Sequence, residues 1–354
     1  MLISVSRRIA TVGQWRYPFL LTPVKRFLVT HLPVNVASRQ GSWKQIRNWC
    51  CTFTTTEMFT VGRHSHREDN INLAEHYKQY GYVIIQDLLS SSEVVSLLDE
   101  MVAICRGARG PIPGIESNDC KRTDVEVLEK YLCIHFPHKI STCIHDLVKE
   151  PKTVSVLQQC IGPNVKSMQT MMFMKGPGKR GQACHQDEYY IPTRDRSLCA
   201  SWVALDDATV ENGCIWIIPG SHHRGIIYPM SDQSNDERYD SSGESIGHNY
   251  PESAWQPVPL TSGSAIFFNG YLLHRSLPNK SKSFRRAFAN HYMSAESLLP
   301  WTNDGRFDTK DDMRDFILVC GEDPYAGLKP LQNFTKPFVR AEVRKEGAVF
   351  NEVA

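Results

Sequence analysis

The spacing of apolar and polar positions changes along the chain, from helical before residue 162 to extended after it. Apolar residues at helical spacing predict a helix that begins at Asn70 and ends at Gly81. Ser90 and Glu93 form a capping-box pattern ahead of a second helix. A short strand is predicted over 82–85, and further helices over 124–132, 138–148 and 151–160.

After residue 162 the apolar segments are short and are separated by turn residues. They predict strands over 165–174, 198–205, 214–218, 256–260, 265–268 and 284–293. Asn212-Gly213 indicates a hairpin, because both residues tolerate positive φ. Helices followed by many short strands predict a mainly β fold with flanking helices, in which the helices pack on a double-sheet jelly roll.

One segment between predicted strands, 231–253, is polar, acidic and rich in serine. A segment of this length and composition is either a disordered surface loop or a lid over a functional site. The sequence leaves both alternatives open.

Charge divides the chain unevenly. Residues 1–56 contain eight Lys or Arg and no acidic residue, although the whole chain has a net charge of only +2. This composition predicts a leader that directs the protein to mitochondria. The alternative for the segment is a disordered basic tail, and the alternative for the location is the cytosol or the peroxisome. The rest of the chain is mildly acidic, which indicates no nucleic-acid partner, and no apolar run is long enough to span a membrane.

The domain organisation follows from these shifts in composition. We expect a leader over 1–56, a polar linker over 57–69, a catalytic domain over 70–335 and a C-terminal tail over 336–354. The 11 cysteines lack the short paired spacings of a zinc site or disulfide framework, so we expect reduced thiols.

Candidate chemistry gathers around Cys184-His185-Gln186-Asp187 and His274, which follows His185 by 89 residues. Two imidazoles and one carboxylate can occupy one face of an Fe(II) ion, leaving positions for a chelating co-substrate and dioxygen. His-x-acid triplets also arise by chance, as at His66-Arg67-Glu68, which lies in a polar linker. His185 and Asp187 instead lie between two predicted strands, and residues two apart in an extended segment point the same way.

Arg285 follows His274 by eleven residues and lies on the predicted strand 284–293. On that strand Arg285 shares a face with His291, whereas Arg286 points to the other face. A buried arginine needs an anionic partner, and the far carboxylate of 2-oxoglutarate suits its planar fork. By contrast, His222 and His223 lie in a turn and are predicted to be exposed and not to bind metal.

The order and spacing of several motifs resemble the phytanoyl-CoA dioxygenase family over roughly residues 70–335. These are His185-Gln186-Asp187-Glu188-Tyr189-Tyr190-Ile191-Pro192, Trp202, Glu211-Asn212-Gly213-Cys214, Pro219-Gly220-Ser221-His222, His274-Arg275-Ser276 and Phe284-Arg285-Arg286-Ala287. The resemblance implies a cupin-like double-stranded β-helix, iron bound by His185, Asp187 and His274, and Arg285 at the distal carboxylate of 2-oxoglutarate. It also implies that the 2-oxoglutarate pocket is lined by Ser276, Trp202, Met171 and Gln186.

The activity that the resemblance implies is hydroxylation of an unactivated C–H bond of a small molecule by dioxygen. Succinate and CO2 are released, and ascorbate is the expected reductant. The substrate is an acyl-CoA ester or a small polar metabolite, and no oligomeric state is indicated. Two alternatives remain, a cupin-like zinc enzyme and a non-catalytic sensor that binds 2-oxoglutarate and metal on the same fold.

Overall fold

The computed structural model describes residues 60–61, 72–115, 121–231, 236–240, 247–299, 315–327 and 336–340. All of them belong to one unit, Glu57–Ala354. The predicted leader, 1–56, and most of the predicted linker, 57–69, lie outside the described residues, so both remain predictions. In the described part of the chain, no helix has the length and apolar character needed to cross a membrane.

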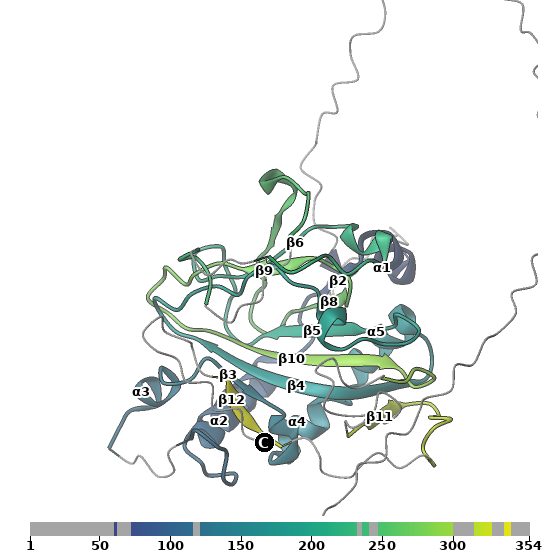
Figure 1. Cartoon of the computed structure of the whole chain (residues 1–354). Helices are drawn as coiled ribbons and strands as arrows, with labels where there is room; N and C mark the ends of the chain where they lie inside the picture. The colour runs from purple at the N-terminus through teal and green to yellow at the C-terminus, as the bar shows by residue number, and fades with distance from the viewer. Residues whose placement is uncertain are drawn as a thin grey trace, which may run out of the picture. The chain divides into compact units, whose positions relative to one another are not determined.

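A large, mostly antiparallel sheet runs in the order β1-β2-β8-β5-β10-β4-β3-β12, and β11 also pairs with β4 (Figure 1). Its strands are β1 Thr60–Val61, β2 Tyr82–Ile85, β3 Cys133–His135, β4 Val165–Lys175, β5 Cys199–Ala204, β8 Ala265–Asn269, β10 Arg285–Ser294, β11 Ile317–Cys320 and β12 Phe338–Arg340. The long strand β10 lies between β4 and β5 and pairs with both.

A smaller antiparallel sheet runs in the order β7-β6-β9, with bounds Gln256–Val258, Ile215–Ile217 and His274–Ser276. Trp202 and Ala289 of the larger sheet share one apolar cluster with Ile215 and Ile217 of the smaller sheet. The two sheets therefore face each other across a common core. This confirms the predicted mainly β fold built on two sheets.

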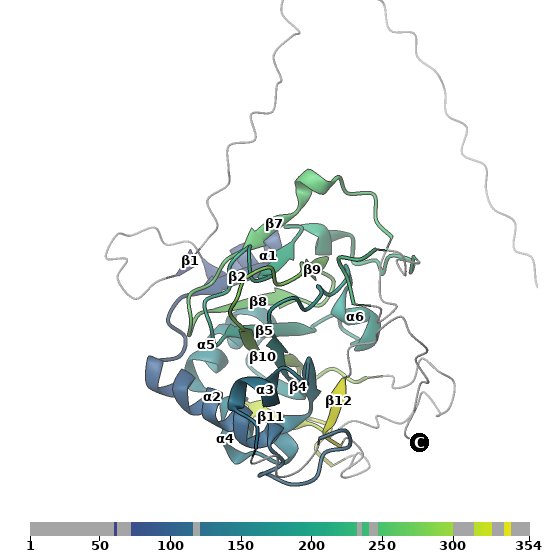
Figure 2. The ribbon, with the colours of Figure 1, turned by 90° about the vertical axis from the view of Figure 1, so that its left-hand side faces the viewer.

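Several of the helices cover the other face of the larger sheet. The helices are α1 Leu73–Tyr80, α2 Ser91–Cys105, α3 Asp124–Leu128, α4 Thr142–Leu147, α5 Pro151–Ile161 and α6 Asp187–Tyr190, with 3-10 turns η1 Pro137–Lys139, η2 Ser221–Arg224 and η3 Glu252–Ala254. Met101 of α2 and Leu157 of α5 pack in one cluster with Phe267 and Phe288 of the sheet. Figures 1 and 2 show α2 and α4 on the side of this sheet that faces away from β9.

Several predicted elements differ in detail from the structure. The helix predicted over 124–132 ends at Leu128, and the chain then enters β3, which had not been predicted. The helix predicted over 138–148 is divided into η1 and α4, because the Ser141 side chain accepts a hydrogen bond from the Ile144 N–H and starts a new helix. The two-residue strand β1 lies in the predicted linker, and β12 lies in the predicted tail, 336–354, where it pairs with β3.

One buried histidine, His138 of η1, belongs to the fold. Its Nδ1 lies 2.7 Å from the Thr170 hydroxyl of β4. Burial, together with the smaller effect of the nearby Lys139, lowers the pKa of His138 from its ordinary 6.5 to about 3. The ring is therefore neutral in the folded protein at pH values where the unfolded chain carries it protonated.

We predict that His138 makes the protein sensitive to mild acid. As the pH falls through about 6.5, the unfolded state binds a proton that the folded state excludes, so the free energy of unfolding decreases. In His138→Gln this decrease should be smaller, by up to about 1.4 kcal/mol per pH unit between about pH 6.5 and 5. Urea denaturation across this pH range measures the slope. Equal slopes for the wild type and His138→Gln would contradict the prediction.

Candidate metal centre

The site begins where two distant segments pair through their main chains. The His185 N–H donates to the His274 carbonyl at 3.0 Å, and the His274 N–H donates back to the His185 carbonyl at 3.2 Å. This antiparallel bridge places the two imidazole rings side by side, with centroids 4.0 Å apart. Both side chains are buried.

Nε2 of each imidazole faces Asp187, and Nε2 of His185 also lies 3.2 Å from the side-chain nitrogen of Gln182. Nδ1 of His185 lies 2.8 Å from the Ala183 carbonyl, and Nδ1 of His274 lies 2.9 Å from the Leu272 carbonyl. A carbonyl can only accept, so both Nδ1 atoms carry the hydrogen and both Nε2 atoms present a lone pair. In metalloproteins, a hydrogen bond of this kind from the other ring nitrogen orients the histidine that binds the metal.

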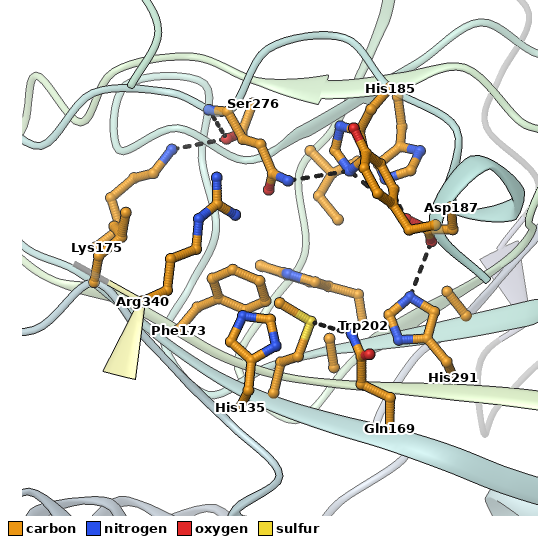
Figure 3. A pocket seen from close by; sticks show the side chains of 18 of the residues that line it. His135, Gln169, Phe173, Lys175, His185, Asp187, Trp202, Ser276, His291 and Arg340 are labelled. Carbon is orange, nitrogen blue, oxygen red and sulfur yellow. Dashed lines mark hydrogen bonds and ion pairs between the residues drawn. The ribbon is translucent and has the colours of Figure 1, made fainter. Parts of the chain in front are cut away.

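Asp187 supplies the third candidate ligand from the first residue of α6. Its Oδ1 lies 3.6 Å from Nε2 of His185 and 3.5 Å from Nε2 of His274. One ligand atom from each of these three residues lies within 4.8 Å of the others. The other carboxylate oxygen, Oδ2, is 3.1 Å from Nε2 of His291 on β10, so His291 holds the carboxylate in place (Figure 3).

The electrostatics of the site keep His185 and Asp187 in the forms that bind a cation. Burial, together with the smaller effect of the adjacent His274 ring, lowers the pKa of His185 to about 3. Burial opposes ionisation of Asp187, but the surrounding histidines, with a hydrogen bond from His291, outweigh it and hold the pKa of Asp187 below its usual range. Two imidazoles and one carboxylate match the donor set of a non-haem Fe(II) centre.

The three candidate ligands line a cavity of about 500 Å³. Met171, Trp202, Ser276 and Arg285, four of the residues predicted to bind 2-oxoglutarate, line the same cavity. Gln186 does not line the cavity, and its side-chain amide bonds instead to the Ile226 and Tyr271 carbonyls and to the Tyr228 N–H. In this position Gln186 supports the adjoining loop rather than the predicted pocket.

Arg285 brings a buried positive charge to this cavity. Its side chain is 4% exposed, its guanidinium lies 5.1 Å from the ring of Trp202, and burial lowers its pKa to about 10. Its Nε has no hydrogen-bond partner, and no acidic group among the described residues forms an ion pair with it. Arg286 points to the opposite face and pairs with Asp206 at 2.7 Å. Arg285 is thus placed to bind an anion inside the cavity.

Ser276 is held so that it can donate into the cavity. Its Oγ accepts hydrogen bonds from the Gln182 N–H at 3.0 Å and from the Lys175 ammonium at 2.9 Å. A hydroxyl oxygen has two lone pairs, so its own hydrogen remains available for an acceptor. Lys175 is directly opposite Arg285 in the pairing of β4 with β10, and burial together with Arg285 holds the pKa of Lys175 well below its ordinary value.

The cavity residues that the sequence did not assign to the site include Lys175, His291 and Arg340. Alternation along 284–293 had placed His291 on the face of Arg285, and this alternation was the available signal. Lys175 ends a buried strand, where a lysine is unusual and therefore informative. Arg340 belongs to β12, whose three residues are too few for a pattern.

Part of the segment 231–253 also reaches the site. The Asp240 N–H donates to the Gly181 carbonyl at 2.7 Å, and Asp240 lines the cavity. Residues 232–235 and 241–246 lie outside the described residues. Asp240 therefore belongs to the site, and the choice between a lid and a disordered loop for the whole segment stays open.

The turn histidines lie apart from the candidate ligands. Nε2 of His222 is 3.0 Å from the Lys78 carbonyl, and Nε2 of His223 is 2.6 Å from the Gln79 carbonyl. These contacts join η2 to α1. Neither residue lines the cavity.

A sequence profile described as Phytanoyl-CoA dioxygenase (PhyH) matches residues 77–287, which is more than half of the chain. The protein named Phytanoyl-CoA dioxygenase of Arabidopsis thaliana is 29% identical over 171 residues, which cover 48% of this chain and 59% of that protein. Phytanoyl-CoA dioxygenase domain-containing protein 1 of Danio rerio is 27% identical over 191 residues, covering 51% and 62%. The peroxisomal phytanoyl-CoA dioxygenase of Homo sapiens is 26% identical over 235 residues, covering 62% and 67%. The match therefore spans less than two thirds of the plant and fish proteins.

Two solved structures share the architecture. The non-heme monooxygenase ThoJ in its apo form aligns with a TM-score of 0.54 at 21% identity, over 71% of this chain and 84% of ThoJ. The non-heme alpha ketoglutarate dependent carbocyclase SnoK from nogalamycin biosynthesis aligns with a TM-score of 0.50 at 23% identity, over 70% and 95%. At these identities the likeness concerns the fold alone, and it confirms the predicted double-stranded β-helix.

We predict that His291 supports metal binding through Asp187. His291→Leu removes the contact to Oδ2 and should lower the affinity for Co(II), used as an air-stable probe, by about 10- to 100-fold. Calorimetric titration of the metal-free protein measures this change. His145→Gln changes a histidine that is 42% exposed and should leave the affinity unchanged. Equal affinities for wild type and His291→Leu would show that this contact does not orient the carboxylate.

Proposed function

The chain belongs to the phytanoyl-CoA dioxygenase family, and on this basis we propose that it is an Fe(II)- and 2-oxoglutarate-dependent dioxygenase. The proposed reaction hydroxylates a C–H bond of a small molecule and releases succinate and CO2. One observation carries the proposal: His185, Asp187 and His274 converge on the same cavity as the buried cation of Arg285. A metal site alone does not require that cation, whereas a site for metal and 2-oxoglutarate does.

The residues present fit both groups. His185, Asp187 and His274 would hold iron, since two Nε2 lone pairs and one carboxylate oxygen already converge. Arg285 would bind the far carboxylate of 2-oxoglutarate through its planar fork, and Ser276 would donate its hydroxyl hydrogen to the same anion. When bound, iron supplies the chemistry that couples oxidative decarboxylation of 2-oxoglutarate to oxidation of the substrate by dioxygen.

In this proposal the chain's own residues bind and orient the iron and the co-substrate, and they exclude water from the cavity. His291 holds Oδ2 of Asp187, which leaves Oδ1 directed toward the two imidazoles. Trp202 and Met171 form apolar walls and are 5% and 8% exposed, so they limit the access of water to the co-substrate. The proposed reaction needs no side chain as a general base, and we assign that role to none of these residues.

Turnover should depend on Asp187. We predict that Asp187→Ala lowers 2-oxoglutarate-dependent succinate formation by more than about 100-fold. This is more than the loss of about 10- to 100-fold expected when a residue that only contacts a metal ligand is replaced. The measurement is succinate release with Fe(II), ascorbate and 2-oxoglutarate, without substrate and with a panel of acyl-CoA esters, free acids and polar metabolites. Asp146→Ala, at a side chain that is 84% exposed, is the matched control. Full activity in purified Asp187→Ala would rule out iron bound by this triad.

Binding of 2-oxoglutarate should depend on Arg285. Loss of a hydrogen-bonded charged partner costs about 1.5–3 kcal/mol, so Arg285→Met should weaken 2-oxoglutarate binding by about 10- to 150-fold. Equilibrium dialysis of the metal-loaded protein measures this directly. Arg286→Met removes the neighbouring charge on the opposite face of β10 and should bind 2-oxoglutarate as the wild type does. Unchanged binding in Arg285→Met would show that Arg285 does not hold 2-oxoglutarate. Absence of 2-oxoglutarate binding in the wild type would favour the zinc enzyme, and normal binding without succinate formation would favour the sensor.

A further inference from the structure

Gln182 contacts both ends of the proposed site. Its main-chain N–H donates to Oγ of Ser276 at 3.0 Å, and its carbonyl accepts from the Ser276 N–H, also at 3.0 Å. At the other end its side-chain nitrogen lies 3.2 Å from Nε2 of His185. Gln182, Ser276 and His185 all line the cavity. One residue therefore joins the group proposed to bind the far carboxylate of 2-oxoglutarate to a candidate metal ligand.

The main chain fixes the position of Gln182. The preceding residue, Gly181, lies so close to the end of β9 that an added Cβ would overlap the Ser276 carbonyl oxygen. On its other side, the Gly181 N–H donates to the Arg238 carbonyl at 2.8 Å, and its carbonyl accepts from the Asp240 N–H at 2.7 Å. None of these contacts uses the side chain of Gln182, so a substitution at this residue leaves them in place.

The contact between Gln182 and His185 uses the lone pair that would bind a metal. Nδ1 of His185 carries the ring hydrogen, because it lies 2.8 Å from the Ala183 carbonyl. Nε2 therefore has one lone pair and no hydrogen. An amide nitrogen can only donate, so the side chain of Gln182 donates to this lone pair. A metal ion on Nε2 needs the same lone pair, and the two interactions exclude each other.

An amide that a metal displaces from His185 needs a new acceptor. The Gln182 side chain is half-buried, and leaving its N–H without a partner there is unfavourable. A ligand that reaches from Ser276 to the metal passes alongside Gln182, because Gln182 contacts both ends of that path. In the proposed function 2-oxoglutarate is this ligand. Its near end, beside the metal, has keto and carboxylate oxygens that can accept.

We propose that Gln182 is a further binding residue for 2-oxoglutarate. Its side-chain amide donates to His185 in the metal-free site and to the near end of 2-oxoglutarate once a metal is bound. This inference rests on the proposed function and adds a residue to its site. The exchange also couples the two ligands: metal binding releases the donor that 2-oxoglutarate uses, and 2-oxoglutarate in turn favours the metal.

Two affinities, both measured by calorimetry, test the exchange: that of the metal-free protein for Co(II), and that of the Co(II)-loaded protein for 2-oxoglutarate. Gln182→Leu removes the donor but keeps bulk, and Gln182→Ala removes both. In each variant the affinity for Co(II) should rise about two- to tenfold, because no hydrogen bond to His185 has to break. The affinity for 2-oxoglutarate should fall about tenfold, because a hydrogen bond to a charged acceptor is lost. Gln158→Leu, at an exposed position on α5, should match the wild type in both.

The opposite signs separate this exchange from a structural role, because a variant that only disturbs the site would lower both affinities. If the wild type binds no Co(II), or binds no 2-oxoglutarate once loaded, the proposed function fails and the inference falls with it. This result is known before any variant is measured. If the wild type binds both, a Co(II) affinity that does not rise, or a 2-oxoglutarate affinity that does not fall, in either Gln182 variant would overturn the inference and leave the proposed function standing.

Discussion

The two main-chain hydrogen bonds between His185 and His274 are the contact on which the site depends. They join segments that are 89 residues apart, and they hold the two imidazoles 4.0 Å from each other. Asp187 enters the same space only because α6 begins two residues after His185. The two sheets face each other across a packed core, and this packing holds His185, which lies in no strand, in register with His274, the first residue of β9.

Charge is the second constraint on this structure. Asp187, Lys175 and Arg285 are all buried beside one cavity, where solvation by water is largely lost. Asp187 is compensated by the surrounding histidines, and Lys175 by bonds to the Ser276 hydroxyl and the Leu277 carbonyl. Arg285 finds no acidic partner among the described residues. A core selected for stability alone would replace such groups with apolar ones. Their presence is explained if anionic ligands complete the site.

Most of the candidate site could be predicted from the sequence, because its members follow strong local rules. Alternation along 284–293 placed Arg285 and His291 on one face, and the spacing of His185, Asp187 and His274 matched one donor set. The position of Arg340 at the cavity could not be predicted from the sequence. Arg340 lies on β12, a strand of three residues that is placed beside the site only by its pairing with β3. The predicted position of Gln186 in the 2-oxoglutarate pocket differs from the structure for a related reason. Its place beside a metal ligand suggested the pocket, whereas its amide forms hydrogen bonds with the main chain of Ile226 and Tyr228. The helix over 138–148 was divided because Ser141 caps a new start, and a local cap can override a continuous helical pattern.

The central claim is that iron and 2-oxoglutarate bind together in this cavity, and one spectroscopic titration tests it most directly. The wild-type protein is titrated with Fe(II) and 2-oxoglutarate in the absence of oxygen, and its visible absorption is followed. The account predicts a weak charge-transfer band that requires both components, saturates at one equivalent of each and disappears when zinc replaces iron. Iron that binds without any change on addition of 2-oxoglutarate would contradict the account.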